Sequence, residues 1–101
     1  MDMQQLRKII DEVDDGLLAL FQERMDIAAE IARHKKEHGL QVHDPARERQ
    51  KLLELTGKVA EGRRGYVSAL FSLLFEMSRA DQERIINPQS APGVAHVGEN
   101  T

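Results

Sequence analysis

Apolar side chains return every three or four positions through the first third of the chain, and no proline interrupts them before residue 45. The stripe consists of Leu6, Ile9, Ile10, Val13, Leu17, Leu20, Phe21, Ile27, Ala28 and Ile31. This spacing predicts one amphipathic helix of about 34 residues that ends near Gly39, a rod of roughly 50 Å. A globular chain of 100 residues has a radius of gyration of only about 13 Å. Two shorter helices cannot cover such a rod, so the stripe favours an intertwined homodimer, and a short antiparallel coiled coil would equally require a second copy.

The rest of the sequence predicts two more helices and no strand. Asp44 and Pro45 indicate a helix start, because an N-cap is followed by proline at the first helical position. This second helix continues through Leu52, Leu55 and Val59. Glycines within residues 57–65 predict a loop, and a third helix then runs over residues 66–86 and ends before Pro88. The predicted fold is all-α, with three helices per chain, one of them very long, in a homodimeric helical bundle.

Residues 1–87 are expected to form one helical domain, and residues 88–101 a disordered tail or linker, because the tail has two prolines and few apolar residues. The 101 residues include 17 acidic and 14 basic side chains, a net charge of -3, so the basic excess of a nucleic-acid-binding protein is absent. No apolar run reaches the roughly 18 residues of a membrane span. The lack of cysteine excludes thiolate metal sites and disulfides and is compatible with a cytoplasmic protein. The four histidines do not have the spacing of a metal site.

Two cations interrupt the apolar stripe of the first helix. Arg24 and Lys35 share one face with Ala28 and Ile31, because eleven residues at ~100° each return to within about 20° of the same azimuth. Other polar residues lie in or beside the apolar stripes of the second and third helices, namely Asp44, Arg47, Glu48, Ser78 and Gln82. Buried charges are costly unless they are paired or bound to a ligand. The pattern therefore indicates an interior site for a small polyanion, with Glu48 accepting from a hydroxyl.

Several of these residues also have a structural explanation that needs no ligand. A single Arg or Lys in an apolar stripe commonly extends its charged end to solvent. Glu48 could pair with Arg24 or Lys51, and Ser78 could be a small core residue. Composition and periodicity alone support a helical dimer with an anion-binding interior, and go no further.

The polar residues match a known family in type and order. The matching series is Leu6-Arg7, Ile10-Asp11, Asp14, Leu17-Leu18, Glu23-Arg24, Ala28, Glu30-Ile31, Lys35, Asp44-Pro45 and Arg47-Glu48. It resembles the all-helical chorismate mutases of the AroQ class over about residues 4–87. By this resemblance, Arg7 and Arg24 hold the substrate carboxylates, and Arg7 comes from the other protomer. Lys35 reaches the breaking ether oxygen and a carboxylate, and Gln82 meets that oxygen from the opposite side.

The resemblance also assigns the remaining polar residues. Asp44, Arg47 and Glu48 correspond to the group at the start of the second helix, with Glu48 on the ring hydroxyl. Ser78 corresponds to the substrate-binding serine that precedes Gln82 on the third helix. The catalytic residues implied in this way are Lys35, Gln82, Arg24 and Glu48.

The spacing of the two arginines supports a shared site independently. Arg7 and Arg24 are 17 residues apart, roughly 25 Å along a straight helix, which no small ligand spans. If the long helices of two copies pair antiparallel, Arg7 of one copy can approach Arg24 and Lys35 of the other. The family fold implies this arrangement and two equivalent sites per dimer.

The implied reaction is the [3,3] rearrangement of chorismate to prephenate in phenylalanine and tyrosine biosynthesis, which needs no cofactor, metal or covalent intermediate. Isochorismate pyruvate lyase, which has the same helical fold, is the alternative enzyme. A non-catalytic helical dimerisation module is the alternative outside enzymes. The tail after Ile86 is also similar to the linker that follows the mutase domain of bifunctional mutase–dehydratase proteins.

Overall fold

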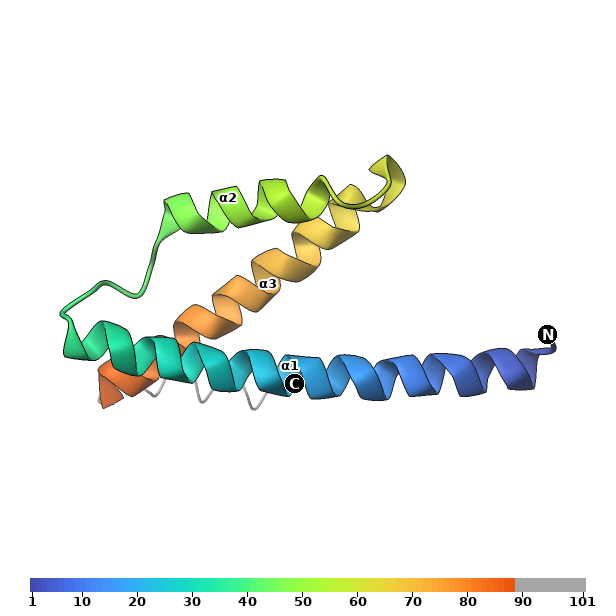
Figure 1. Cartoon of the computed structure of the whole chain (residues 1–101), viewed down its shortest axis with the longest axis horizontal. Helices are drawn as coiled ribbons and strands as arrows, with labels where there is room; N and C mark the ends of the chain where they lie inside the picture. The colour runs from blue at the N-terminus through green and yellow to red at the C-terminus, as the bar shows by residue number, and fades with distance from the viewer. Residues whose placement is uncertain (89–101) are drawn as a thin grey trace.

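The computed structural model describes residues 1–88, which form three helices (Figure 1). They are α1 (Met3–Glu37), α2 (Pro45–Thr56) and α3 (Glu61–Ile86). The part of the chain that the structure describes contains no strand, so the predicted all-α class and the three helices are confirmed. The predicted tail or linker at residues 88–101 lies, apart from Pro88, outside the described residues.

Local sequence signals explain both ends of α1. Asp2 accepts from the backbone N–H of Gln5 at 2.8 Å, and the Gln5 side chain accepts from the backbone N–H of Asp2 at 2.9 Å, which completes a capping box. At the other end, Gly39 has a φ of 64°, a left-handed conformation that glycine adopts at little cost. The long first helix is therefore confirmed, with a start three residues before the first apolar residue of the stripe.

The start of α2 is also confirmed. The Asp44 carboxylate accepts from the backbone N–H of Arg47 at 3.1 Å, and Pro45 occupies the first helical position. Proline suits that position because its missing N–H would have no acceptor in the first turn. The helix ends at Thr56, so Val59, which the stripe assigned to it, lies beyond its end.

The prediction for the start of α3 is wrong by five residues. The helix begins at Glu61 rather than Tyr66 and includes Gly62 and Gly65. Backbone N–H groups in a first turn need no intrahelical acceptor, and the Glu61 carboxylate suits the positive end of the helix dipole. Arg64 adds a tie across the turn, because its Nε donates to the Thr56 carbonyl at 3.1 Å. Two glycines at about 1 kcal/mol each do not outweigh these contributions together with the packing of the helix.

This boundary can be tested through Gly62, where an added Cβ would meet no atom within 4 Å. Gly62→Ala should stabilise the protein by about 0.5–1 kcal/mol and raise Tm by about 2–8 °C, because alanine favours the helix and restricts the unfolded chain. The matched control is Gly39→Ala, which should lower Tm because φ is positive there. A fall in Tm for Gly62→Ala, measured by circular dichroism, would show that α3 begins later.

The helices pack at one end of the molecule only. α3 contacts both the C-terminal half of α1 and α2, whereas the N-terminal half of α1 projects away from them (Figure 1). Buried apolar side chains among the described residues are Ala28, Ala32 and Phe75. The radius of gyration is 16.5 Å, above the about 13 Å of a globular chain of this length.

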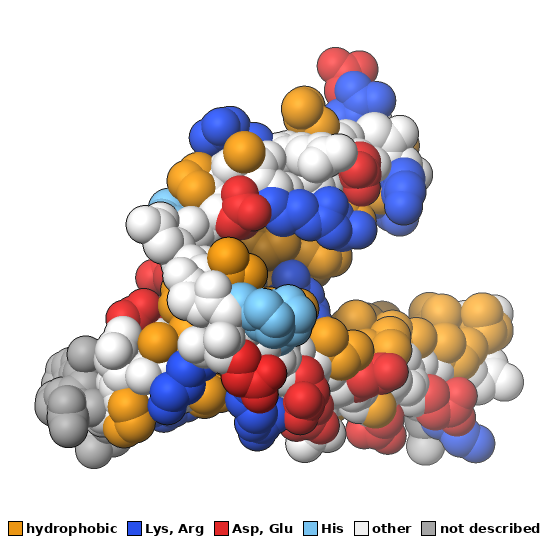
Figure 2. All heavy atoms as spheres, turned by 60° about the vertical axis from the view of Figure 1, so that its left-hand side comes forward, with side chains coloured by type: hydrophobic (Ala, Val, Ile, Leu, Met, Phe, Trp, Pro, Cys, Tyr) orange, Lys and Arg blue, Asp and Glu red, His pale blue; other side chains and the backbone are white. Residues whose placement is uncertain are grey.

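The projecting half of α1 exposes a continuous apolar face. Its members are Met3, Leu6, Ile9, Ile10, Val13 and Leu17, each between 44% and 61% exposed. Figure 2 shows hydrophobic side chains gathered along one side of this arm and charged ones along the other. Within residues 1–88 this face stays exposed, with Arg63 of α3 alone lining the same hollow from another helix, and we call it the arm face below.

Candidate functional site

A cavity of about 370 Å³ lies between the C-terminal half of α1, the start of α2 and the C-terminal half of α3. Its lining residues are Ile31, Lys35, Val42, Asp44, Arg47, Glu48, Phe75, Ser78, Arg79 and Gln82. The structure thus brings together most of the side chains that the sequence singled out. Arg24 and Arg7 are not among the lining residues, and Arg79 was not predicted.

Lys35 joins α1 to the loop that precedes α2. Its Nζ donates to the Val42 carbonyl at 2.7 Å and lies 3.4 Å from the Gln82 Oε1. The ammonium group is therefore held at the cavity wall by a backbone oxygen and an amide oxygen. A third N–H of the ammonium has neither of these acceptors and can serve an anion.

Gln82 is one of two buried polar residues in the described chain, the other being Ser78. Its Nε2 donates to the Ala28 carbonyl at 3.0 Å, and its Oε1 faces Lys35. A primary amide has two N–H groups, so one donor remains after the bond to Ala28. The small side chains of Ala28 and Ala32 let α3 approach α1 closely enough for this contact.

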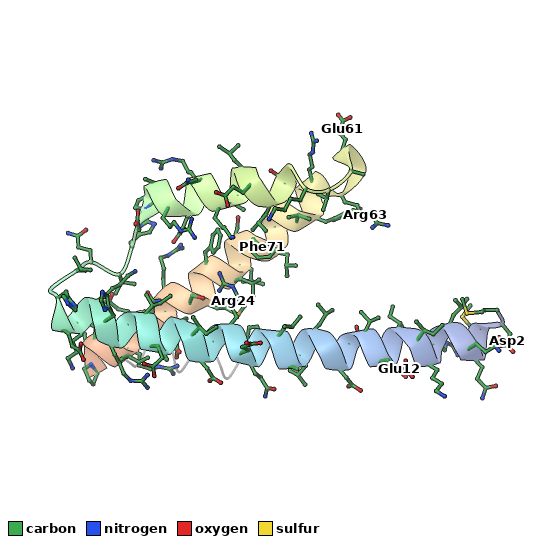
Figure 3. All side chains as sticks on the ribbon, in the orientation of Figure 1. Asp2, Glu12, Arg24, Glu61, Arg63 and Phe71 are labelled. Carbon is green, nitrogen blue, oxygen red and sulfur yellow. The ribbon has the colours of Figure 1, made fainter. Side chains whose placement is uncertain are left out.

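Arg24 lies just behind the cavity, between α1 and α3. Its Nη1 donates to the Ser78 Oγ at 2.7 Å, and its guanidinium lies 5.6 Å from the centre of the Phe75 ring. Figure 3 shows Arg24 extending from α1 toward α3, whereas Glu12 lies on the opposite side of α1. Desolvation by burial lowers the pKa of Arg24. The guanidinium nonetheless stays charged, because arginine does not lose its proton in proteins.

The carboxylate of Glu48 pairs with Arg79, a partner that was not predicted from the sequence. The Nη1 of Arg79 donates to both carboxylate oxygens of Glu48, each at 2.6 Å, so the suggested pairing with Arg24 or Lys51 is wrong. His43 Nε2 lies 3.9 Å from the same carboxylate. The sequence carried a signal for Arg79, since it follows Phe75 by one helical turn and precedes Gln82 by three residues.

Asp44 and Arg47 lie at the rim. Both are exposed, and the Asp44 carboxylate is already engaged with the Arg47 backbone N–H as the cap of α2. The Arg47 guanidinium has no partner in the described part of the chain and is available to an anion entering the cavity.

Arg7 is not brought to this cavity by the single chain. It lies on the projecting half of α1, exposed, beside the apolar residues of the arm face. Its position along α1 is 17 residues before Arg24, roughly 25 Å at the rise of an α-helix. Its predicted role therefore depends on a second copy.

The sequence profile of the family described as chorismate mutase type II matches residues 6–83. The chain belongs to the chorismate mutase type II family. The matched range includes every residue from Arg7 to Gln82 discussed above, so the family assignment and the cavity concern the same part of the chain.

Three relatives of this chain are enzymes whose names give one or two activities. A chorismate mutase of Methanocaldococcus jannaschii is 40% identical over 45 residues, 45% of this chain and 46% of the relative. A bifunctional chorismate mutase/prephenate dehydratase of Escherichia coli K12 is 36% identical over 95 residues, 85% of this chain and 25% of the relative. A 3-dehydroquinate dehydratase of Pyrobaculum aerophilum is 34% identical over 77 residues, 76% of this chain and 23% of the relative. The chain thus spans less than half the length of each, and no solved structure matches it significantly.

The lining of this chorismate mutase family site has more positively than negatively charged side chains. Lys35, Arg47 and Arg79 at the lining outnumber Asp44 and Glu48, and Arg24 adds a charge behind them. Within residues 1–88 no group of three or more His, Asp or Glu side chains is placed to hold a metal ion. None of the three helices is long and apolar enough to cross a membrane.

Proposed function

We propose that this chain catalyses the rearrangement of chorismate to prephenate. The observation that carries the proposal is the convergence of Lys35, Gln82 and Glu48, from three different helices, on one cavity in a member of this family. Chorismate is a dianion with a ring hydroxyl and an ether oxygen. A pocket with an excess of cations, the Glu48 carboxylate and one buried amide offers a partner to each of these groups.

The binding half of the mechanism rests on the arginines. Guanidinium groups bind carboxylates through two parallel hydrogen bonds, which fixes orientation as well as position. Arg24, held by Ser78 and the Phe75 ring, would orient one substrate carboxylate, and Arg47 at the rim would attract the dianion into the cavity. Holding the folded conformer of the substrate removes much of the entropic barrier of a unimolecular rearrangement.

The electrostatic half rests on Lys35 and Gln82. As the C–O bond breaks, negative charge develops on the ether oxygen. The Lys35 ammonium and the remaining N–H of Gln82 are fixed before the substrate arrives, by Val42 and by Ala28. Donors fixed in advance stabilise the developing charge without a cost of reorganisation in the transition state. Glu48 would accept from the ring hydroxyl and Ser78 would complete the substrate contacts, so no cofactor is required.

The active form in this proposal is an intertwined homodimer. Among the described residues 1–88 the arm face is exposed, and a second long helix running antiparallel would cover it. The same pairing would deliver the partner's copy of position 7 to the cavity, which accounts for the distance of Arg7 from its proposed site. Each dimer would then have two equivalent sites. Residues 1–87 would be the mutase domain, acting in the cytoplasm in aromatic amino acid biosynthesis, either alone or joined to a further domain as in the bifunctional relatives.

The test is product identity with two substrates offered separately to the purified chain. Chorismate should be consumed and prephenate formed, whereas isochorismate should release no pyruvate. Pyruvate release from isochorismate without prephenate formation would assign the chain to the lyase reaction instead. Failure to turn over chorismate or to bind a bicyclic transition-state analogue would favour a non-catalytic helical module.

The pH profile tests the proposed place of Gln82. An amide donates at any pH, so kcat/KM of the wild type should be roughly flat from about pH 6 to 8. In Gln82→Glu the new carboxylic acid can donate only while protonated, so kcat/KM should rise as the pH falls through that range. Gln22→Glu on the exposed side of α1 is the matched control and should keep the wild-type profile. Identical profiles for Gln82→Glu and the wild type would exclude Gln82 from the ether oxygen.

A further inference from the structure

Arg79 pairs with Glu48, the carboxylate that α2 contributes to the lining of the described cavity. Its contact with Glu48 is made by one nitrogen to both oxygens at 2.6 Å, and the two side chains are 32% and 24% exposed. Charge-assisted hydrogen bonds that are partly shielded from water are stronger and better oriented than surface ion pairs. The carboxylate is therefore fixed in the structure rather than free to rotate.

The Arg79–Glu48 contact lies at a point of the fold where it can hold two helices together. α2 and α3 meet at the turn between them and diverge toward the start of α2 (Figure 1), and Glu48 lies in that first turn. Among the ion pairs within residues 1–88, the Arg79–Glu48 pair is the one that joins two helices. It ties the two helices together at their divergent end, beside the cavity.

We propose that Arg79 is a positioning residue that sets the orientation of Glu48 toward the ring hydroxyl of the substrate. This inference rests on the proposed function. Without Arg79, the basic side chain left within 4 Å of the Glu48 carboxylate is that of His43, whose Nε2 lies 3.9 Å away on the exposed loop before α2. The carboxylate would then lose its fixed direction, and the cavity would lose a positive charge that offsets it.

A double-mutant cycle separates positioning from direct substrate contact. Arg79→Met should lower kcat/KM by about 10–100-fold, because a small misplacement of a binding group has effects of that size. If Arg79 acts through Glu48, the same substitution in a Glu48→Gln background should change kcat/KM by less than about twofold. If Arg79 contacts the substrate itself, its effect should persist in that background, which would overturn the inference.

Two further variants guard against a merely structural effect. Arg84→Met removes the other arginine ion pair of α3, with Asp81, away from the cavity, and should leave kcat/KM unchanged. Arg79→Lys keeps the charge but has a shorter reach, so it should recover part of the activity lost in Arg79→Met. Circular dichroism identifies the temperature range in which every variant is folded, and the kinetics are compared there.

The outcomes also separate this inference from the proposed function. An active wild type with Arg79→Met equal to Arg84→Met overturns the inference and leaves the proposed function standing. A wild type that does not consume chorismate overturns the proposed function and the inference with it. A loss in Arg79→Met that disappears in the Glu48→Gln background supports both.

Discussion

Arg24→Ala should lower kcat/KM for chorismate by about 10³-fold, because in the proposed site Arg24 is the partly buried cation that would pair with a substrate carboxylate. Arg24 donates to the Ser78 hydroxyl at 2.7 Å and its guanidinium lies 5.6 Å from the centre of the Phe75 ring, so its charge is held between α1 and α3. Arg33→Ala is the matched control, since Arg33 is an exposed arginine of the same helix that pairs with Glu30. The control should retain wild-type turnover. Substantial activity in folded Arg24→Ala would remove Arg24 from the site.

Arg7→Ala should show a loss as large as Arg24→Ala, although Arg7 lies on the exposed arm of α1, far from the cavity of its own chain. The physical reason is that the site in the proposed dimer takes this arginine from the other copy. The loss should appear in kcat/KM while the dimer persists in sedimentation velocity. Wild-type activity in Arg7→Ala would mean that the site is complete within one chain.

Lys35→Ala should lower kcat by about 10²–10³, the cost of removing one fixed donor from a developing oxyanion. The ammonium lies 2.7 Å from the Val42 carbonyl and 3.4 Å from the Gln82 Oε1, at the wall of the cavity. Lys36→Ala, at the next and exposed position, is the matched control and should change kcat little.

The bond from Lys35 to Val42 also holds the loop before α2, so a fall in stability has to be separated from a fall in catalysis. Thermal unfolding of Lys35→Ala should show how far Tm falls, and the rates are then compared well below that temperature. Near-wild-type kcat in folded protein would reject the assignment of Lys35 to the ether oxygen.

Helix ends with a local chemical cause could be predicted from the sequence. Asp44 and Pro45 start α2, and Gly39 ends the α1 region with a positive φ, because capping and left-handed turns depend on a few neighbouring residues. The start of α3 could not be predicted in this way. Gly62 is compatible with both a loop and a first helical turn, and the choice depends on ties such as the bond from Arg64 to Thr56.

In the candidate site, too, features that depend on one helix could be predicted, and features that depend on how helices or copies pack could not. The burial of Ser78 and Gln82 follows from their phase with Phe75 along one helix, which sequence periodicity reports directly. The pairing of Glu48 with Arg79 joins two residues that are 31 positions apart in sequence and on different helices, so it depends on the crossing of α2 and α3. Periodicity within each helix contains no information on that crossing. The place of Arg7 depends on a second copy.

The double variant Arg7→Ala/Arg24→Ala provides a control for subunit mixing. Mixed in equal amounts with wild type, it forms heterodimers in which each site lacks one of the two arginines if Arg7 acts across the dimer. Only wild-type homodimers would then be active, about a quarter of all dimers after random exchange. If Arg7 acted within its own chain, each heterodimer would keep one site and the rate would be about twice as high.

The central claim, a chorismate mutase site shared between two copies, is tested most directly by mixing Arg7→Ala with Arg24→Ala. Each heterodimer would contain one site with both arginines and one site with neither. After random exchange of equal amounts, chorismate consumption should recover from near zero to about a quarter of the wild-type rate. Heterodimers demonstrated by two different affinity tags, with no recovery of chorismate consumption, would contradict the account.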